Sequence, residues 1–296
     1  ICSSMKVGVY GRAFDESFIP NIQELFDTIV SFDWEIAIYQ PFRSYLAPRL
    51  AISEHKEVFN KYCDVKGEID ILICIGGDGT FLETINIVRD SGIPILGVNT
   101  GRLGFLASTY KEDIVDVLNA IKDGRYRLQT RSMITLITEE GLFGEDNFAL
   151  NELTVHKKDS SSMITIHTYI GDLYLNSYWA DGLIISTPTG STAYSLSCGG
   201  PIMVPGAKDY VITPIAPHNL NVRPVVVPDE RTIRLKIEGR GREYLCSLDS
   251  RSVTIDSAIE LTIKKAKFQL NVIQTENQNF LNTIRNKMMW GLDRRN

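Results

Sequence analysis

The sequence has few cysteines, and they are not spaced as a disulfide framework or a structural metal site requires. The five cysteines are scattered over 296 residues, are odd in number and include no CxxC pair. This pattern argues against a disulfide-rich fold and a zinc site, and it is typical of reduced thiols in a reducing compartment. The four histidines show no HExxH or other metal-ligand spacing, so a metal held by histidine is not expected.

Long apolar runs and an excess of basic charge are also missing. No run approaches the ~18 apolar residues that cross a membrane, and no basic and apolar signal segment is evident at the N-terminus. The 31 Lys and Arg are outnumbered by 36 Asp and Glu, which gives a formal charge of −5. Proteins that bind nucleic acid or anionic membranes need an excess of Lys and Arg. We therefore expect a soluble cytoplasmic enzyme that binds neither.

The first third of the sequence alternates between β-rich and helical segments. Apolar or alternating runs predict strands at 5–10, 34–38, 69–75 and 94–98, and helical spacing predicts helices at 19–30, 51–62 and 80–90. The run at 69–75 is continuously apolar, as in a parallel strand that is buried on both faces. Repeated βαβ units of this size predict a doubly wound, parallel α/β sheet.

Beyond residue 124 the pattern changes to closely spaced β-rich runs. Strands predicted at 134–138, 153–156, 163–170, 183–187, 225–227, 232–237 and 261–264 favour a mostly antiparallel second domain. Apolar spacing also predicts a helix at 114–121 and a closing helix through Phe280, Leu281, Ile284 and Met288. We therefore predict an α/β domain formed by residues 1–108 with 275–296, and a β-rich domain formed by residues 109–274.

Three glycines and one carboxylate follow the buried strand at 69–75. Gly76, Gly77, Asp78, Gly79 and Thr80 lead into the next helix, at the edge of an α/β sheet where ligands bind. Glycine lets the backbone approach a ligand closely, and the amides at a helix start favour phosphate oxygens. A carboxylate beside phosphates suggests a base for an attacking hydroxyl or a ligand for Mg²⁺. The alternative is a tight turn in which Asp78 merely caps the helix.

A second distinctive stretch, Asp181–Pro201, is rich in hydroxyl groups. Seven of the twelve residues from Ser186 to Ser197 are Ser or Thr. An apolar strand leads into a Pro-Thr-Gly turn, and Ser191 is placed to cap a following helix. Clustered hydroxyls suit a hydrogen-bonding ligand such as a nucleotide ribose. The alternative is a turn whose hydroxyls satisfy their own backbone.

These stretches together resemble one enzyme family. Gly76–Thr80, Asn99–Leu106 (NTGRLGFL), Asn151-Glu152 and Asp181–Pro201 occur in the order and approximate spacing found in NAD kinases. The Asn-Glu pair says little by itself, and the GGDGT sequence is shared with phosphofructokinases, diacylglycerol kinases and sphingosine kinases. The stretch Asp181–Pro201, by contrast, is specific to NAD kinases. The resemblance, which is to NAD kinases of the bacterial type, covers nearly the whole chain.

The resemblance implies transfer of a phosphoryl group from ATP to the 2′-hydroxyl of the adenosine ribose of NAD, giving NADP. Mg²⁺ or another divalent metal would be required, with ligands that the sequence does not identify. Asp78 would take the proton of the hydroxyl, with Gly79 beside the substrate. The dinucleotide would also contact Phe105, Asn151, Glu152, Asp181, Thr189, Thr192, Ala193, Tyr194, Ser195, Leu196, Ser197 and Ala216. The donor phosphates would lie near Gly76, Gly77, Thr80 and Arg102.

The resemblance also implies a fold and an assembly. A Rossmann-like N-terminal α/β domain would be followed by a C-terminal domain of antiparallel sheets, and the last helix would return to the first domain. The chain would form a homodimer or homotetramer in which a neighbouring subunit completes the NAD site. Two other functions remain open: a lipid or sugar kinase that shares the GGDGT sequence, and a non-catalytic NAD-binding sensor. The first would lack a counterpart of Asp181–Pro201, and the second would have no need of Asp78 as a base.

Overall fold

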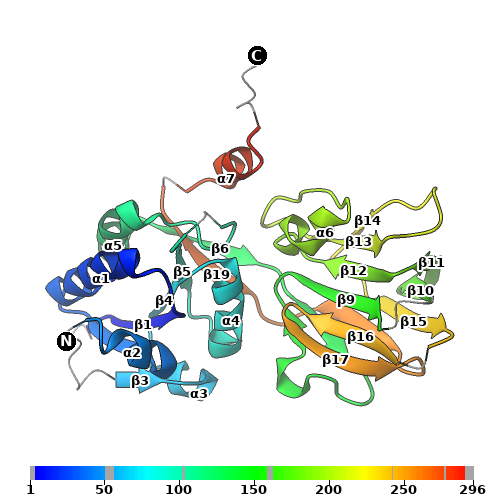
Figure 1. Ribbon diagram of the computed structural model, residues 1–296, viewed down its shortest axis with the longest axis horizontal. Coiled ribbons are helices and arrows are strands. Elements are labelled where there is room, and N and C mark those ends of the chain that lie inside the picture. The colour runs from blue at the N-terminus through cyan, green and yellow to red at the C-terminus, as the bar shows by residue number, and fades with distance from the viewer. Residues whose placement is uncertain are drawn as a thin grey trace. The chain divides into compact units, whose positions relative to one another are not determined.

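The chain folds into two compact units. The computed structural model describes residues 4–50, 57–101, 104–158, 163–241, 243–276 and 278–290. Unit 1 comprises residues 1–130 and 270–296, and unit 2 comprises residues 131–269. Figure 1 shows that helices and strands alternate in unit 1, whereas unit 2 is built almost entirely from strands. The predicted fold class is therefore confirmed.

Unit 1 is built on a seven-stranded sheet in the order β3-β2-β1-β4-β5-β19-β6. Because β1 pairs in parallel with both β2 and β4, the direction in which strands are added reverses beside β1. Ligands of open α/β sheets bind outside the carboxyl ends of the strands at such a switch point. The strands are β1 (Lys6–Gly11), β2 (Glu35–Tyr39), β3 (Glu57–Phe59), β4 (Ile71–Ile75), β5 (Ile95–Val98), β6 (Arg127–Arg131) and β19 (Leu270–Gln274).

Helices cover both faces of this sheet, because side chains of successive strand residues point to opposite faces. Ile71, Ile73 and Ile75 of β4 belong to a core that also contains side chains of α1, α2 and α5. On the other face, α4 packs so close to β5 that a Cβ at Gly97 would lie 3.1 Å from the Phe81 ring. The helices are α1 (Ile19–Ser31), α2 (Gln40–Leu46), α3 (Tyr62–Val65), α4 (Asp78–Val88), α5 (Ile114–Lys122) and α7 (Phe280–Lys287), with 3-10 turns η1 (Glu16–Phe18) and η2 (Lys111–Asp113).

Two elements of unit 1 differ from the prediction. The helix predicted at 51–62 is wrong at residues 57–59, which form the edge strand β3 and pair in parallel with β2; residues 51–56 lie outside the described part of the chain. Pairing with an existing sheet edge outweighs weak helical spacing in so short a segment. The helix predicted at 80–90 is present, but it begins at Asp78 and ends at Val88.

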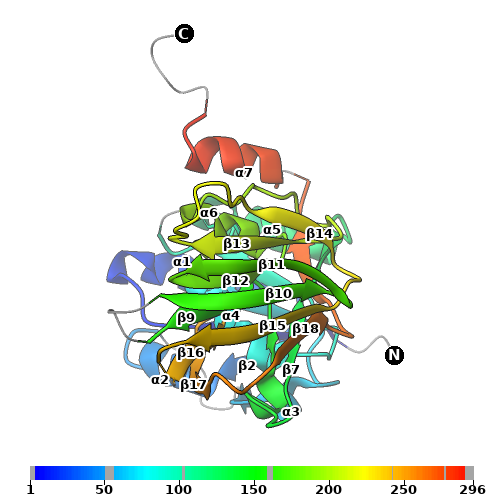
Figure 2. The same cartoon turned by 90° about the vertical axis from the view of Figure 1, so that its right-hand side faces the viewer.

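Unit 2 consists of two six-stranded antiparallel sheets whose inward side chains share one core. The strand orders are β11-β10-β15-β18-β7-β8 and β14-β13-β12-β9-β16-β17. Figure 2, which is turned by 90° from Figure 1, shows many of these strands toward the viewer. The strands are β7 (Ile134–Ile137), β8 (Phe148–Ala149), β9 (Glu152–Lys157), β10 (Ile164–Ile170), β11 (Leu173–Ala180), β12 (Gly182–Ser186), β13 (Asp209–Ile215), β14 (Val225–Pro228), β15 (Ile233–Gly239), β16 (Glu243–Leu248), β17 (Arg251–Asp256) and β18 (Leu261–Lys265).

The boundaries between the units differ from the predicted ones, which were 108/109 and 274/275. The structure divides the chain at 130/131 and 269/270. Helix α5 belongs to the core of unit 1, because Ile114, Val117, Leu118 and Ile121 pack with the side chains of α1. Strands β6 and β19 then extend the sheet of unit 1, with Val272 paired to Ile95. Unit 1 therefore includes more of the chain than helical spacing alone indicated.

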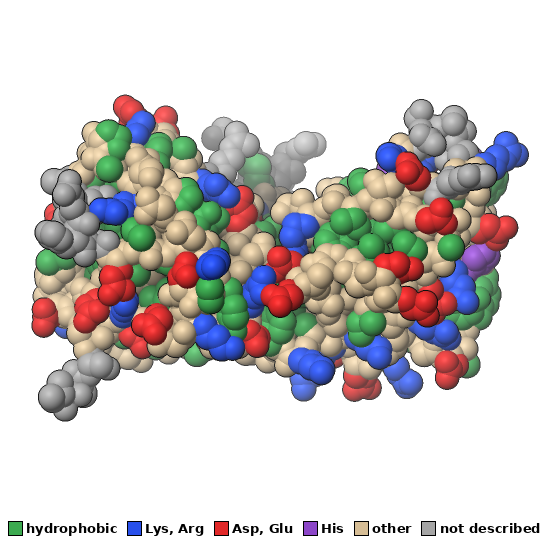
Figure 3. Space-filling view, turned by 90° about the horizontal axis from the view of Figure 1, so that it is seen from below, with side chains coloured by type: hydrophobic (Ala, Val, Ile, Leu, Met, Phe, Trp, Pro, Cys, Tyr) green, Lys and Arg blue, Asp and Glu red, His purple; other side chains and the backbone are tan. Residues whose placement is uncertain are grey.

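Two properties of the described residues concern membrane and nucleic-acid binding. In the part of the chain that the structure describes, no helix is both long and apolar enough to cross a membrane. Acidic and basic side chains are mixed over the face of the molecule that Figure 3 shows. Nucleic-acid backbones are bound by continuous basic surfaces, and this face does not present one.

Candidate active site

The GGDGT sequence forms the turn from the buried strand β4 into α4. Gly76 and Gly77 separate the last residue of β4 from Asp78, the first residue of α4. A Cβ at Gly76 would lie 2.5 Å from Oγ1 of Thr80, so this turn closes onto the helix only with glycine at position 76. No side chain caps α4, and the amides at such a helix start favour an anion. The turn lies at the carboxyl end of β4, beside the switch point of the sheet.

The carboxylate of Asp78 does not cap its own helix but binds the loop that follows β5. Its Oδ2 accepts the backbone N–H of Phe105 (2.8 Å), and its Oδ1 accepts those of Leu106 (2.9 Å) and Ala107 (3.0 Å). Three successive N–H groups of one loop thus bind a single carboxylate. An ionised carboxylate has about four lone-pair positions, so Asp78 retains the capacity to accept one further proton donor.

The same loop is in contact with the last helix of unit 1. The ring of Phe105 lies 6.3 Å from that of Phe280 in α7, and Nζ of Lys287 lies 4.4 Å from the centre of the Phe105 ring. These contacts confirm that the closing helix docks on the N-terminal α/β unit. Inside the loop, Oδ1 of Asn99 accepts the N–H of Gly101 (2.6 Å). Arg102 lies outside the described residues.

In unit 2, the pair Asn151-Glu152 marks the start of β9, and the turn after β12 packs against it. The N–H of Thr187 donates to the carbonyl of Asn151 (2.9 Å), and the Thr187 hydroxyl donates to the carbonyl of Leu150. A Cβ at Gly190 would overlap the carbonyl oxygen of Asn151. The Pro-Thr-Gly turn therefore approaches Asn151 closely because residue 190 is glycine.

Glu152 is a buried carboxyl group with an unusual titration. The residue is 9% exposed, and its Oε2 atom has no hydrogen-bond partner among the described residues. Burial raises the pKa of Glu152 to about 8, and the nearby charge of Asp249 acts in the same direction. The backbone N–H of Tyr194 opposes this shift by hydrogen bonding. Glu152 therefore titrates near neutral pH, where an ordinary glutamate is ionised.

Asp181 and Ala216 lie on neighbouring segments of unit 2. Oδ1 of Asp181 is 2.6 Å from Nζ of Lys157, and the Asp181 N–H donates to the carbonyl of Ile215 (3.0 Å), the last residue of β13. The next residue, Ala216, has φ of +45°, a conformation that costs energy in a residue with a side chain. The two predicted site residues are thus held side by side, and one of them is strained.

The hydroxyl-rich stretch forms two short turns of helix, η4 (Gly190–Thr192) and α6 (Tyr194–Ser197). The prediction that Ser191 caps a helix is wrong, because its buried Oγ donates to the carbonyl of Pro188 (2.7 Å) and accepts the N–H of Met203 (2.9 Å). Ser195 shares a hydrogen bond of 2.8 Å with Thr213 of β13. Several hydroxyls therefore satisfy polar groups of the fold itself, as the alternative interpretation expected.

The structure arranges the predicted site residues in two groups. The group in unit 1 contains Gly76–Thr80 and Phe105, which hydrogen bonding joins through Asp78. The group in unit 2 contains Asn151, Glu152, Asp181, Thr189, Thr192–Ser197 and Ala216. The sequence did not indicate two further residues that position these groups. Gly104 leaves room for the Asp78 carboxylate, and Asp249 accepts the backbone N–H groups of residues 150–152. Gly104 lies inside the NTGRLGFL stretch, whereas Asp249, in a turn between two strands, gave no signal in the sequence.

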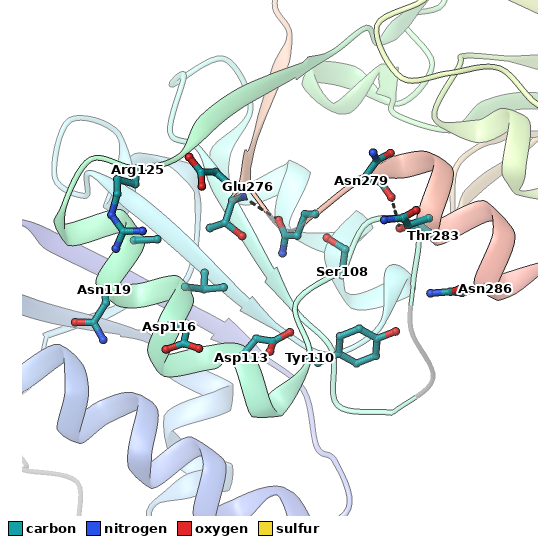
Figure 4. Close-up of a pocket in the computed structure, with 15 residues that line it drawn as sticks. Ser108, Tyr110, Asp113, Asp116, Asn119, Arg125, Glu276, Asn279, Thr283 and Asn286 are labelled. Carbon is teal, nitrogen blue, oxygen red and sulfur yellow. Dashed lines mark hydrogen bonds between the residues drawn. The ribbon is translucent and has the colours of Figure 1, made fainter.

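A separate polar pocket of about 430 Å³ lies within unit 1. Figure 4 shows Asn119 and Asp116 of α5 on one side of it and Asn279, Thr283 and Asn286 on the other. None of the predicted site residues lines this pocket. The residues singled out by the sequence and the pocket are therefore different features of unit 1.

Family models and individual proteins of similar sequence indicate the same family for this chain. Residues 40–126 match the family model of the ATP-NAD kinase N-terminal domain, and residues 150–275 match that of the ATP-NAD kinase C-terminal domain. The NAD kinase of Cytophaga hutchinsonii is 46% identical over 293 residues, which cover 99% of this chain and 100% of that protein. The NAD kinase of Flavobacterium psychrophilum is 47% identical over 294 residues, with the same coverage of both chains.

Solved structures with the same fold come from more distant relatives. The crystal structure of yeast NADH kinase complexed with NADH has a TM-score of 0.85 at 21% identity, over 97% of this chain and 88% of that one. An NAD kinase from Archaeoglobus fulgidus in complex with ATP has a TM-score of 0.73 at 24% identity, over 96% and 99% of the two chains. These two likenesses establish the fold. Together with the near-complete coverage at 46–47% identity, the two matching domain models show that the chain belongs to the NAD kinase family.

Proposed function

We propose that this protein transfers the γ-phosphoryl group of ATP to the 2′-hydroxyl of the adenosine ribose of NAD, releasing NADP and ADP. The observation that carries the proposal is the 46–47% identity to two NAD kinases over 99% of the chain. The geometry of unit 1 agrees with it. A carboxylate that can accept one more proton donor lies at the start of an uncapped helix, beside the switch point of a parallel sheet.

In this reaction Asp78 accepts the proton of the 2′-hydroxyl. The ribose oxygen forms a bond to the γ-phosphorus, and the bond from that phosphorus to the bridging oxygen breaks, so that ADP leaves with the electron pair. The three N–H groups of residues 105–107 fix the carboxylate in one position, which favours a single attack geometry. A positioned base contributes about 10²–10⁴-fold. The remainder of phosphoryl-transfer catalysis comes from alignment and charge neutralisation.

The donor phosphates are proposed to face Gly76, Gly77 and Thr80. Among the described residues, no group of three or more His, Cys, Asp or Glu side chains is placed to hold a metal ion. Mg²⁺ commonly takes one or two carboxylates together with substrate phosphates and water, so these residues fit a metal that would be held mainly by ATP, with the Asp78 carboxylate of the same turn as a candidate protein ligand. When bound, the metal would neutralise charge on the phosphates.

The group in unit 2 is proposed to bind NAD. Asn151 and Glu152 would contact the ribose and adenine, and Asp181 would contact the nicotinamide end. The remaining contacts of this group would come from Thr189, Thr192–Ser197 and Ala216. The buried and largely uncharged character of Glu152 at neutral pH supports a hydrogen-bonding role rather than an ionic one.

We also propose that the protein is cytoplasmic and forms a homodimer or homotetramer. The four cysteines that the structure describes are free thiols, as is usual in a reducing compartment. Unit 2 exposes large apolar side chains, including Leu173 (77% exposed) and Tyr174 (58%) of β11 and Leu220 (88%). Large exposed apolar and aromatic side chains are common in association surfaces, which supports an oligomer. Light scattering of the purified protein would measure the oligomeric state.

The proposed reaction is tested by incubating the purified protein with NAD, ATP and Mg²⁺ and measuring NADP with an NADP-specific dehydrogenase. Asp78→Asn should lose at least about 10²-fold in turnover. Asp116→Asn, the same change in the first turn of α5, should retain wild-type turnover. NAD binding without NADP formation, with NADH and polyphosphate also tried, would indicate a sensor. Turnover of a lipid or sugar alone would indicate the other kinase class.

A further inference from the structure

Asp249 lies in the turn between β16 and β17 and binds three consecutive backbone amides. Its Oδ2 accepts the N–H of Leu150 (2.9 Å), and its Oδ1 accepts those of Asn151 (2.8 Å) and Glu152 (3.2 Å). In the reverse direction, the N–H of Asp249 donates to the carbonyl of Glu152 (3.0 Å). Its φ is +51°, a conformation that Asp tolerates better than most residues with a side chain.

The arrangement repeats, in unit 2, what Asp78 does in unit 1. In each unit a carboxylate accepts three successive backbone N–H groups, those of residues 105–107 for Asp78 and those of residues 150–152 for Asp249. Burial raises the pKa of the Asp249 carboxyl group, whereas the three backbone N–H groups and the nearby Arg251 oppose that shift. Because all three of its backbone partners are donors, the group binds them as an ionised acceptor, and such hydrogen bonds are about twice as strong as neutral ones. The backbone at Asn151 and Glu152 is therefore held in place by a charged group distant in the sequence.

Neighbouring groups reinforce this position of the chain. The guanidinium of Arg251 donates to the carbonyls of Asp146 and Phe148 and lies over the Phe148 ring, 5.2 Å from its centre. These bonds fix the strand that leads into Asn151. The turn after β12 binds the same segment through Thr187. The segment of the Asn-Glu pair is therefore held by hydrogen bonds from two turns, the β16–β17 turn through Asp249 and the turn after β12 through Thr187.

We propose that Asp249 is a positioning residue for the acceptor dinucleotide, because its carboxylate binds the amides of residues 150–152 and so orients Asn151 and Glu152. This inference rests on the proposed function. Asp249 acts through the Asn-Glu pair, without a role in the chemical step. Loss of its charge is therefore expected to change the binding of NAD and its pH dependence, and to leave the use of ATP unchanged.

The charged and titratable groups around Glu152 give the sign of the pH effect. Asp249 faces Glu152 from the β16–β17 turn, and Arg251 faces Asp249 from β17. Tyr194 faces Glu152 from α6, and Cys198 faces it from the position that follows α6. The negative charge of Asp249 opposes ionisation of Glu152 and so raises its pKa. Removing that charge lowers the pKa of Glu152. The corresponding break in a plot of log(kcat/KM) for NAD against pH then moves to lower pH.

The test compares two variants of the whole enzyme with the wild type. Asp249→Asn should raise the KM for NAD at least about tenfold, because its hydrogen bonds to the three amides are weaker. The KM for ATP should stay within about twofold of the wild-type value. Its pH break should move to lower pH. Asp249→Glu keeps the charge but not the geometry, so it should raise the KM for NAD and leave the pH break in place. Should Asp249→Asn not fold, this second variant still tests the positioning.

A matched control lies at the other end of the same hairpin. Asp256, the last residue of β17, accepts the N–H of Ala258 (2.9 Å) within its own turn, and Asp256→Asn should leave both KM values and the pH break unchanged. A wild-type KM for NAD in both Asp249 variants would overturn the proposal, as would an equal rise for NAD and ATP. Absence of NADP formation by the wild-type protein would instead contradict the proposed function.

Discussion

Gly104 and Asp78 approach each other so closely that no other residue fits at position 104. A Cβ atom built on Gly104 would overlap Oδ1 of Asp78, the atom that accepts the N–H groups of Leu106 and Ala107. The atom that would have to move belongs to the proposed base itself. The glycine in the NTGRLGFL stretch is therefore a steric requirement for placing the carboxylate.

Gly104→Ala should displace the Asp78 carboxylate and lower kcat by at least about 10²-fold, because a small misplacement of a catalytic group is costly. The melting temperature of the variant should fall as well, because the displacement would strain the three hydrogen bonds from the loop to the Asp78 carboxylate. Gly101→Ala is the matched control: it lies in the same loop, and a Cβ there meets no described atom within 4 Å. Equal turnover of the two variants would contradict the steric argument.

Asp78→Asn should lose stability as well as activity. The amide group of asparagine would present an NH₂ to at least one of the three N–H donors at 2.8–3.0 Å, leaving a partly buried donor unsatisfied. The expected cost is about 1–3 kcal/mol in the free energy of unfolding, measured by denaturant titration. Asp116→Asn, exposed in the first turn of α5, should change that free energy by less than about 0.5 kcal/mol. An Asp78→Asn variant as stable as the wild type would show that the loop does not depend on the carboxylate.

The location of the GGDGT turn could be predicted because its causes are local. A continuous apolar run specifies the buried strand β4, and glycines at 76 and 77 specify the turn into α4. The partners of Asp78 were harder to foresee. The sequence suggested a helix cap or a catalytic group, whereas the carboxylate binds a loop 27–29 residues further along the chain.

Features that depend on distant pairing were not predictable from local patterns. Asp249 contacts residues that precede it by 97–99 positions, and nothing in the sequence around it indicates that contact. Residues 57–59 became a strand because β2 offered them an edge. Ser191 lies where a cap is expected, but its hydroxyl binds Pro188 and Met203 because the fold brings Met203 beside it.

Gly190→Ala should disturb the segment that carries Asn151. The added Cβ would overlap the carbonyl oxygen of Asn151, a backbone atom that cannot rotate away as a flexible side chain could. We expect the KM for NAD to rise by about tenfold or more and the melting temperature to fall by several degrees. Gly101→Ala again serves as the control for a glycine with open space. Wild-type values of both quantities in Gly190→Ala would mean that the turn and Asn151 are not in close contact.

Glu152 makes the stability of the protein depend on pH in a defined direction. Burial first, and the charge of Asp249 second, raise the pKa of Glu152 from 4.5 to about 8 in the folded protein. Because the folded state holds this proton more tightly than the unfolded state, the resulting stabilisation is fully present below the unfolded-state pKa. It is lost as the pH rises through about 8. A pKa that differs by one between the folded and unfolded states corresponds to about 1.4 kcal/mol, so the effect is measurable.

Glu152→Gln keeps the size of the side chain but cannot ionise, so this contribution disappears. The melting temperature of the wild type should therefore fall more than that of Glu152→Gln between about pH 6 and pH 9. Glu24→Gln, an exposed change on α1, should follow the wild-type curve throughout. If the wild type and Glu152→Gln lose stability in parallel, the proton on Glu152 is not retained in the folded state. Its proposed role as a neutral hydrogen-bonding partner of the ribose would then have to be replaced by a role as an anion.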